Sequence, residues 1–239
     1  MLTALPFYIS NIMSCFVKNA DARHRLRGNV NRFFYAPLMA RVVKDIYGEK
    51  ASSIKFVRQH TMGRCVCVVN DKYFVKVFRN MSGARLKNFQ RLINYVKDSL
   101  GVKVPDVYIA KNNHMYVTEK ISGRGIYDFD KGFVLKHEKK ILAQVDNIIS
   151  KLQSIDVHKI PDAGRFCVAL ESTSKKIKPE VITKDSVLAH FDLNVRNFLF
   201  DDDMNICGLI DFDSMAITND KNKDKQIFMK YWNRYKEKK

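Results

Sequence analysis

Three polar side chains near the C-terminus combine residue types and a spacing that suit phosphoryl transfer. Asp192 is followed five residues later by Asn197, and Asp211 stands between apolar residues further along the chain. Phosphoryl transfer needs one group that orients the attacking hydroxyl and takes up its proton. It also needs oxygen ligands for the magnesium ions that bridge the nucleotide phosphates. Asp192 suits the first task, and Asn197 and Asp211 suit the second.

The residues between Asn197 and Asp211 predict a hairpin that brings these two side chains together. Residues 198–200 and 206–210 have the apolar composition of short strands. Residues 201–205 are rich in Asp and Asn, which favour turns. A hairpin of this length returns Asp211 to the end that holds Asn197, so that both face one cation. The acids of the turn are alternative metal ligands, but solvated acids are common in turns.

This segment resembles the aminoglycoside phosphotransferase and choline kinase group, the small-molecule branch of the protein-kinase-like fold. The pattern of that group is H-x-D-x-x-x-x-N followed by a hydrophobic residue and D-[FW]-[DE]. The chain carries HFDLNVRN from His190 and LIDFD up to Asp213. Protein kinases have H-R-D and D-F-G instead, and here Phe191 replaces the arginine and Asp213 replaces the glycine. The chain therefore resembles the small-molecule branch more than the protein kinases.

The resemblance implies an α+β, protein-kinase-like two-lobed fold with a small antiparallel β lobe and a mainly helical C-lobe. Residues 1–50 would then be a basic, amphipathic N-terminal helical extension, residues 51–121 the N-lobe with its nucleotide-binding sheet and one helix, and residues 122–239 the C-lobe with the catalytic loop and metal-binding hairpin. The implied cofactors are ATP and Mg²⁺. The implied acceptor is a hydroxyl of a small molecule or glycan, such as a sugar, a lipopolysaccharide-type glycan, choline or an aminoglycoside.

The predicted N-lobe supplies the candidate nucleotide contacts. Lys76 alternates with apolar residues on a predicted strand and resembles the V-A-I-K lysine that contacts the α- and β-phosphates. An edge-strand lysine pointing to water is the alternative. The turn that joins the first two predicted strands has one glycine, Gly63, where backbone N–H groups offer only a weak phosphate-binding signal. The backbone from Glu119 to Ile121 resembles the hinge that binds adenine.

One feature departs from the group's pattern. The helix predicted over residues 84–100 should carry a glutamate that pairs with the strand lysine, but no Glu occurs between Lys50 and Glu119. Asn88 and Gln90 are the nearest polar substitutes, and a neutral amide cannot neutralise a lysine. The alternative function is therefore a catalytically weakened pseudokinase that serves as a basic, nucleotide-binding adaptor.

Apolar periodicity and turn residues predict the remaining elements. Strands are expected at residues 53–59, 64–69, 73–79, 104–108 and 114–119, and helices at residues 34–48, 84–100, 137–155 and 225–235. Residues 157–185 form an irregular, basic insert suited to substrate contacts. Because 26 residues follow Asp213, we expect an open acceptor site, which favours a large glycan or lipid-linked sugar over an enclosed drug.

The chain has a formal net charge of +17 over 239 residues. This charge predicts an anionic partner such as a membrane surface, an anionic substrate or, less favoured, nucleic acid. A solvated lysine-rich surface from a biased genome is the alternative. The five cysteines include no C-x-x-C pair, which indicates reduced thiols and a cytoplasmic protein.

The N-terminal region leaves two interpretations open. Residues 7–17 are apolar but too short and too polar to span a bilayer, and no basic residue precedes them as a secretory signal would require. Their apolar helical face beside the basic residues 18–32 suits a peripheral position on an anionic inner membrane face; a helix packed on the kinase domain explains them equally well. The stretch CFVKNADARHRLRGN also resembles the F-x-x-x-x-x-R-x-x-(L/I)-R openings of bacterial surface-glycan biosynthesis proteins.

Overall fold

The structure, a computed structural model, describes residues 20–60, 64–78, 83–111, 115–160 and 181–238. They form two compact units. Unit 1 comprises the chain up to Gln90 together with Asp106–Lys120, and unit 2 comprises Arg91–Pro105 together with the chain from Ile121. Gly63 and residues 7–17, which carried two of the predictions, lie outside the described residues.

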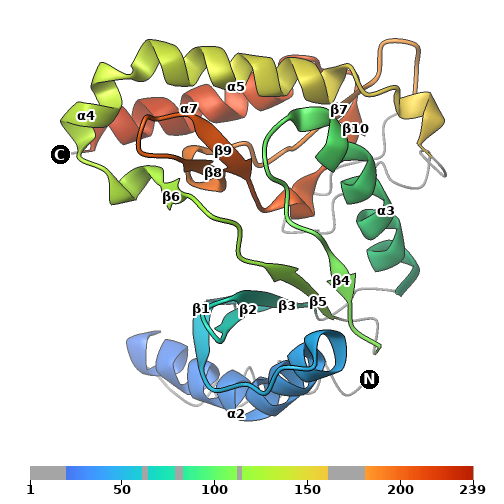
Figure 1. Ribbon diagram of the computed structural model, residues 1–239, viewed down its shortest axis with the longest axis vertical. Helices are drawn as coiled ribbons and strands as arrows, with labels where there is room; N and C mark the ends of the chain where they lie inside the picture. Colours follow the sequence, from blue (N-terminus) through green and yellow to red (C-terminus); the bar gives the residue numbers. More distant parts are fainter. Residues whose placement is uncertain (1–19, 61–63, 79–82, 112–114, 161–180, 239) are drawn as a thin grey trace. The chain divides into compact units, whose positions relative to one another are not determined.

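Unit 1 is built on an antiparallel sheet of five strands (Figure 1). The strands follow the order β1-β2-β3-β5-β4, with bounds β1 Ile54–His60, β2 Arg64–Val69, β3 Tyr73–Phe78, β5 Met115–Glu119 and β4 Tyr108–Ile109. Asn70 and Asp71 lie in the turn between β2 and β3, and both have positive φ angles, of 55° and 52°. Two successive residues with positive φ suit the central positions of a tight turn, which the Lys72 N–H closes by donating to the Val69 carbonyl at 3.1 Å.

Helix α2 (Ala20–Tyr47) covers one face of this sheet (Figure 1). Its buried residues pack with alternate residues of β2 and β3, and this core contains Tyr35, Met39, Val43, Cys65, Cys67, Val75 and Val77. The helix ends at Gly48, whose φ of +74° suits glycine and whose N–H donates to the Lys44 carbonyl at 2.9 Å. These packed residues begin at Tyr35, so both interpretations of the N-terminal region, residues 7–32, stay predictions.

Unit 2 combines helices with two small sheets (Figure 1). Its elements are β6 Arg124–Gly125, α4 Lys131–Lys136, α5 Glu138–Gln153, β7 Val187–Ala189, β8 Phe198–Phe200, β9 Ile206–Leu209, β10 Ala216–Thr218 and α7 Lys223–Glu237, with 3₁₀ turns at Ile126–Asp128, Val157–Lys159, Val195–Asn197 and Phe212–Ser214. The strands pair as β6-β8-β9 and β7-β10. Helices α5 and α7 lie side by side, and buried Trp232 of α7 donates to Glu138 of α5 at 2.7 Å.

The long predicted elements are confirmed, whereas one predicted strand is wrong. The structure forms α3 (Gly83–Leu100) close to the expected bounds. The strand expected over 104–108 is reduced to Tyr108–Ile109, because Lys103 pairs instead with β9: its N–H donates to Cys207 and its carbonyl accepts from Leu209, both at 3.0 Å. The helix expected over 137–155 is preceded by the separate α4. None of the described helices is long and apolar enough to cross a bilayer.

Candidate functional site

The loop that carries Asp192 begins with a backbone held by a buried carboxylate. Asp224, in the first turn of α7, accepts hydrogen bonds from the N–H groups of His190 at 2.7 Å and Phe191 at 2.9 Å. Burial raises the pKa of Asp224, although these two backbone donors act in the opposite direction. The sequence around Asp224 gave no signal for this role. It anchors the start of the loop to α7, 34 residues away in sequence.

His190 connects the same loop to the end of the hairpin. Its buried ring accepts from the Asp192 N–H at Nδ1 (3.3 Å), and its Nε2 lies 3.1 Å from the Ile210 carbonyl. Together these bonds require the tautomer with the proton on Nε2. The ring also packs against Phe212, with centroids 4.7 Å apart. His190 therefore positions the loop and has no atom left to act as a base.

The Asp192 carboxylate is oriented by two amides of its own loop. Its Oδ1 accepts from Asn194 Nδ2 at 2.9 Å, and Asn197 Nδ2 donates to the Asp192 carbonyl at 2.7 Å. A longer contact of 3.5 Å joins Asn197 Nδ2 to Asp192 Oδ2. Because the nitrogen of the Asn197 amide faces Asp192, a cation at this residue would meet its Oδ1.

The hairpin brings Asp211 next to Asn197, as predicted. Strands β8 and β9 pair Phe198 with Leu209, and the Ile210 N–H donates to the Asn197 carbonyl at 2.9 Å. Asp211 then adopts a left-handed conformation with φ 64° and ψ 49°. Such a backbone is uncommon for a residue other than glycine, and strained residues of this kind concentrate at functional sites.

The carboxylate of Asp211 and the amide oxygen of Asn197 are suitable ligands for Mg²⁺. This ion prefers oxygen and is usually held by one or two protein carboxylates, with water and substrate phosphates completing its shell. In the part of the chain that the structure describes, no group of three His, Cys, Asp or Glu side chains could hold a metal ion. A cation here would therefore need the nucleotide phosphates as further ligands.

The acidic residues between β8 and β9 contact the turn itself and a neighbouring arginine. Asp201 Oδ1 accepts from the N–H groups of Asp203 and Asn205, while its Oδ2 accepts from the Asn205 side chain at 2.8 Å. These hydrogen bonds, led by the one from the Asn205 side chain, lower the pKa of Asp201. Asp202 pairs with Arg124 at 3.0 Å. The alternative that these acids bind metal is thus less consistent with their contacts.

In unit 1, Lys76 lies on an interior strand. β3 is flanked by β2 and β5, and Lys76 faces Tyr116 across the β3–β5 pair. Its side chain is half-buried, and Nζ lies 5.7 Å from the Tyr116 ring centroid. The alternative of an edge-strand lysine is therefore wrong. Lys72, in the preceding turn, is exposed and paired with Glu49 at 2.9 Å.

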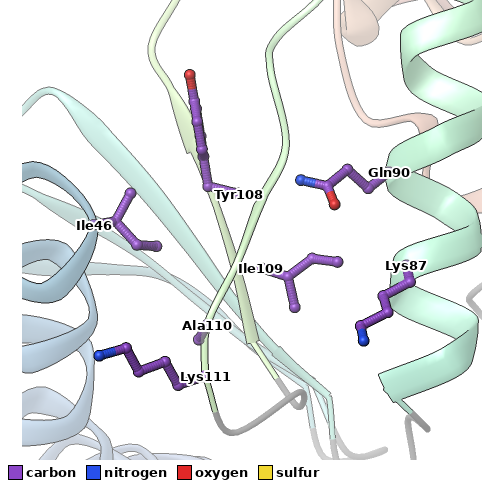
Figure 2. A pocket seen from close by; sticks show the side chains of 7 residues that line it. All are labelled: Ile46, Lys87, Gln90, Tyr108, Ile109, Ala110 and Lys111. Carbon is purple, nitrogen blue, oxygen red and sulfur yellow. The ribbon is translucent and has the colours of Figure 1, made fainter.

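The helix that lacks a glutamate uses one of the two candidate amides, Asn88 and Gln90, elsewhere. Gln90 Nε2 donates to the Val107 carbonyl at 2.6 Å, and its side chain extends from α3 toward β4 (Figure 2). There it lines an open depression of about 320 Å³ whose other lining residues are Ile46, Lys87, Tyr108, Ile109, Ala110 and Lys111. Asn88 is the other amide, and it is half-buried. Gln90 is thus committed to a backbone partner.

The predicted hinge residues end β5. Glu119 closes that strand opposite Tyr73 and is exposed, while the half-buried Ile121 begins the stretch assigned to unit 2. Between them, the Lys120 N–H donates to the Lys72 carbonyl at 2.7 Å. Adenine binding would therefore depend on the backbone groups of Glu119 and Ile121. The third predicted nucleotide contact, Gly63, lies outside the described residues.

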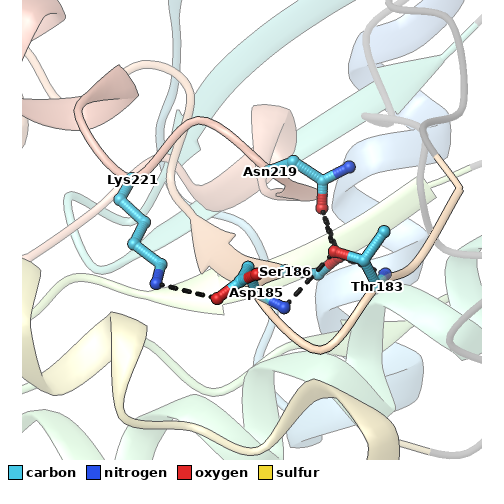
Figure 3. Close-up of polar contacts among 5 residues, drawn as sticks. All are labelled: Thr183, Asp185, Ser186, Asn219 and Lys221. Carbon is cyan, nitrogen blue, oxygen red and sulfur yellow. Dashed lines mark hydrogen bonds and ion pairs between the residues drawn. The ribbon is translucent and has the colours of Figure 1, made fainter.

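A polar network fixes the C-terminal end of the predicted substrate insert to the segment that follows β10. Asn219 Oδ1 accepts from Ser186 at 2.5 Å and from Thr183 at 3.1 Å (Figure 3). Lys221 pairs with Asp185 at 3.5 Å in the same group. Most of the insert lies outside the described residues. The network therefore fixes the C-terminal end of the insert to Asn219 and Lys221, which precede Asp224 in the chain.

Part of the chain matches a known protein family. Residues 169–219 match the model of the phosphotransferase enzyme family, a span that includes Asp192, Asn197 and Asp211. No curated protein matches the sequence significantly.

Solved structures with the same fold include three types of antibiotic phosphotransferase. The GDP complex of an aminoglycoside 2'-phosphotransferase-IIIa mutant superposes with a TM-score of 0.60 at 14% identity, covering 82% of this chain and 77% of that one. The aminoglycoside phosphotransferase APH(3'')-Id from Streptomyces rimosus gives 0.57 at 12% identity, covering 84% of each chain. The macrolide 2'-phosphotransferase MphH from Brachybacterium faecium gives 0.54 at 15%, covering 85% and 82%.

These matches confirm the resemblance to the aminoglycoside phosphotransferase group and the α+β, protein-kinase-like fold predicted from the sequence. The family model also indicates the predicted enzyme class, a phosphotransferase. The roles of the individual site residues, the membrane contact and the cytoplasmic location stay predictions.

Proposed function

We propose that this chain is an ATP- and Mg²⁺-dependent phosphotransferase that moves the γ-phosphate to a hydroxyl of a polar small molecule or glycan. The observation that carries the proposal is the cluster of Asp192, Asn197 and Asp211, joined by the hydrogen bonds of one loop and one hairpin. Phosphotransferases of the same fold bind GDP, ADP or ATP in their solved structures, which supports a nucleotide donor.

Each residue of the cluster has a distinct task in this reaction. Asp192, held by Asn194 and Asn197, accepts the proton of the acceptor hydroxyl as its oxygen bonds to the γ-phosphorus and ADP leaves. Asp211 and Asn197 would hold Mg²⁺, which neutralises charge on the phosphate oxygens. Lys76 would bind the α- and β-phosphates. Fixing these groups before the substrate arrives lowers the entropic part of the barrier.

The experiment combines nucleotide binding with transfer. Purified protein is heated with ATP, with Mg²⁺ and with both, and transfer of labelled γ-phosphate is followed over a panel of sugars, glycans and aminoglycosides. We expect ATP to raise the melting temperature only when Mg²⁺ is present, and at least one acceptor to become labelled. Without any such Mg²⁺-dependent stabilisation, the proposed activity would be wrong.

The second candidate is a nucleotide-binding adaptor with weak or no turnover. It is favoured by α3, where no acid stands near the middle of the helix and Gln90 is bonded to Val107. Mg²⁺-dependent stabilisation by ATP without transfer to any acceptor of the panel would favour this candidate. A lipopolysaccharide-type glycan as the acceptor and a peripheral position at the membrane are further parts of the first proposal.

A further inference from the structure

Arg196 places a positive charge on the same loop as the proposed base. Its side chain is exposed, while its neighbours Val195 and Asn197 are buried. Its N–H donates to Asn194 Oδ1 at 2.9 Å, and Asn194 Nδ2 donates to Asp192 Oδ1 at the same distance. One amide therefore bridges the Arg196 backbone and the Asp192 carboxylate. Arg196 therefore lies on the same hydrogen-bonded loop as Asp192, four residues further along the chain.

A second element orients the guanidinium. The carbon at its centre lies 5.4 Å from the ring centroid of Tyr127, and Lys238 Nζ lies 5.6 Å from the same centroid. Both distances lie within the range of a cation–π contact. Lys131 donates to the carbonyls of Lys236 and Lys238 and so holds this end of the chain. Two cations thus share one aromatic ring that is 47% exposed.

The acids beside Tyr127 are engaged by backbone groups. Asp128 Oδ2 accepts from the Gly125 N–H at 2.8 Å, and Asp130 Oδ1 accepts from the Phe133 N–H at 2.9 Å. Within the described residues, no carboxylate forms an ion pair with Arg196. The charge of Arg196 is thus directed to solvent beside the loop.

We propose that Arg196, assisted by Lys238, binds a phosphate or carboxylate group of the acceptor, so that the substrate is an anionic sugar or alcohol. This inference rests on the proposed function and specifies its substrate class. The planar guanidinium can bind such a group through two parallel hydrogen bonds, and lysine adds a point charge. The net charge of +17 would attract the same substrates from a distance. Aminoglycosides carry protonated amines, which Arg196 would repel.

The chain offers a matched control for a charge reversal. Arg234 is also an exposed arginine over a tyrosine, 5.7 Å from the ring centroid of Tyr231, but it lies on α7 and not on the loop of Asp192. Arg196→Glu and Arg234→Glu therefore remove the same type of cation–π contact and change the net charge equally. Arg196→Gln serves as a milder variant if the reversal lowers the melting temperature.

The test uses glucose 6-phosphate, glucose and kanamycin as anionic, neutral and cationic probes. The guanidinium N–H signal of Arg196 in ¹⁵N-arginine-labelled protein, assigned with Arg196→Gln, is followed during each titration. Dissociation constants are measured by calorimetry for every variant. We expect a saturable shift with glucose 6-phosphate only, and at least tenfold weaker binding in Arg196→Glu but not in Arg234→Glu.

Three results would overturn the inference: no saturable shift with glucose 6-phosphate, equal binding by both charge reversals, or tighter binding of glucose or kanamycin. Stabilisation by ATP with Mg²⁺ is recorded for the same samples and should be unchanged in Arg196→Glu. If ATP with Mg²⁺ does not stabilise the wild-type protein, the proposed function is contradicted. The titrations with sugars test the binding role of Arg196 separately.

Discussion

The two regions that carry the predicted chemistry are held in place in different ways. In unit 2, Asp192, Asn197 and Asp211 are fixed by hydrogen bonds between residues of one loop and one hairpin, with Asp224 as an anchor. In unit 1, Lys76 is placed by strand pairing and by a core that includes α2. The first kind of site can be recognised from the spacing of its residues in the sequence. The second kind depends on packing between residues that are far apart in the sequence.

The largest effect is expected for Asp192→Asn. If Asp192 takes up the proton, turnover should fall roughly 10²- to 10⁴-fold, because an amide cannot accept it. Stabilisation by ATP with Mg²⁺ should change little, since Asp192 orients the acceptor and not the nucleotide. Asp202→Asn is the control, as Asp202 is an exposed acid of the nearby turn. Equal turnover of the Asp192 variant and the wild type would remove Asp192 from its role.

Asp211→Ala should have the next largest effect. Loss of a charged ligand should lower Mg²⁺-dependent ATP affinity roughly tenfold to hundredfold, the range of a charge-assisted bond of about 1.5–3 kcal/mol. Asn197→Ala should lose less affinity, because an amide offers no net charge to the cation. The measurement is calorimetric titration with and without Mg²⁺. A variant Asp211→Ala that binds ATP with the wild-type dependence on Mg²⁺ would refute the metal assignment.

The sequence predicted the fold, and the hairpin of unit 2 that brings Asn197 and Asp211 near each other, through features with short-range causes. The β8–β9 hairpin forms from strand and turn residues that are neighbours in the sequence. Asp224 could not be predicted, because its role arises only when α7 packs near the loop. The strand expected over 104–108 failed for a similar reason: Lys103 finds its partners in β9, a hundred residues later.

Asp224→Asn tests the anchor that the sequence did not reveal. Asparagine can accept one of the two N–H bonds but turns a donor toward the other, so the free energy of unfolding should fall by about 1–3 kcal/mol. Because burial raises the pKa of Asp224 in the folded protein, its ionisation costs stability as pH rises from the unfolded pKa through the folded one. Urea denaturation at several pH values should show this dependence in the wild type and lose it in Asp224→Asn.

Lys76→Met tests the unit 1 side of the comparison. If Lys76 binds phosphate, its loss should weaken ATP binding about tenfold, because one charge-assisted contact disappears. Lys72→Met is the matched control, since Lys72 is a nearby exposed lysine already paired with Glu49. Isothermal titration of both variants decides between them. A larger loss for Lys72→Met would transfer the assignment to the turn.

Gln90→Glu should have the smallest effect and bears directly on the glutamate missing from α3. The new carboxylate has no hydrogen to donate to the Val107 carbonyl, so the bond of 2.6 Å is lost, at a cost of about 1 kcal/mol in unfolding free energy. We expect no gain in turnover, because Gln90 is turned toward β4 (Figure 2). Asn88→Glu, on the same helix, places the charge at the other candidate position. Denaturation midpoints and turnover are measured for both. A several-fold rise in turnover in Gln90→Glu would mean that position 90 contacts Lys76 in the active protein. The bond from Gln90 to Val107 would then be absent from the active state.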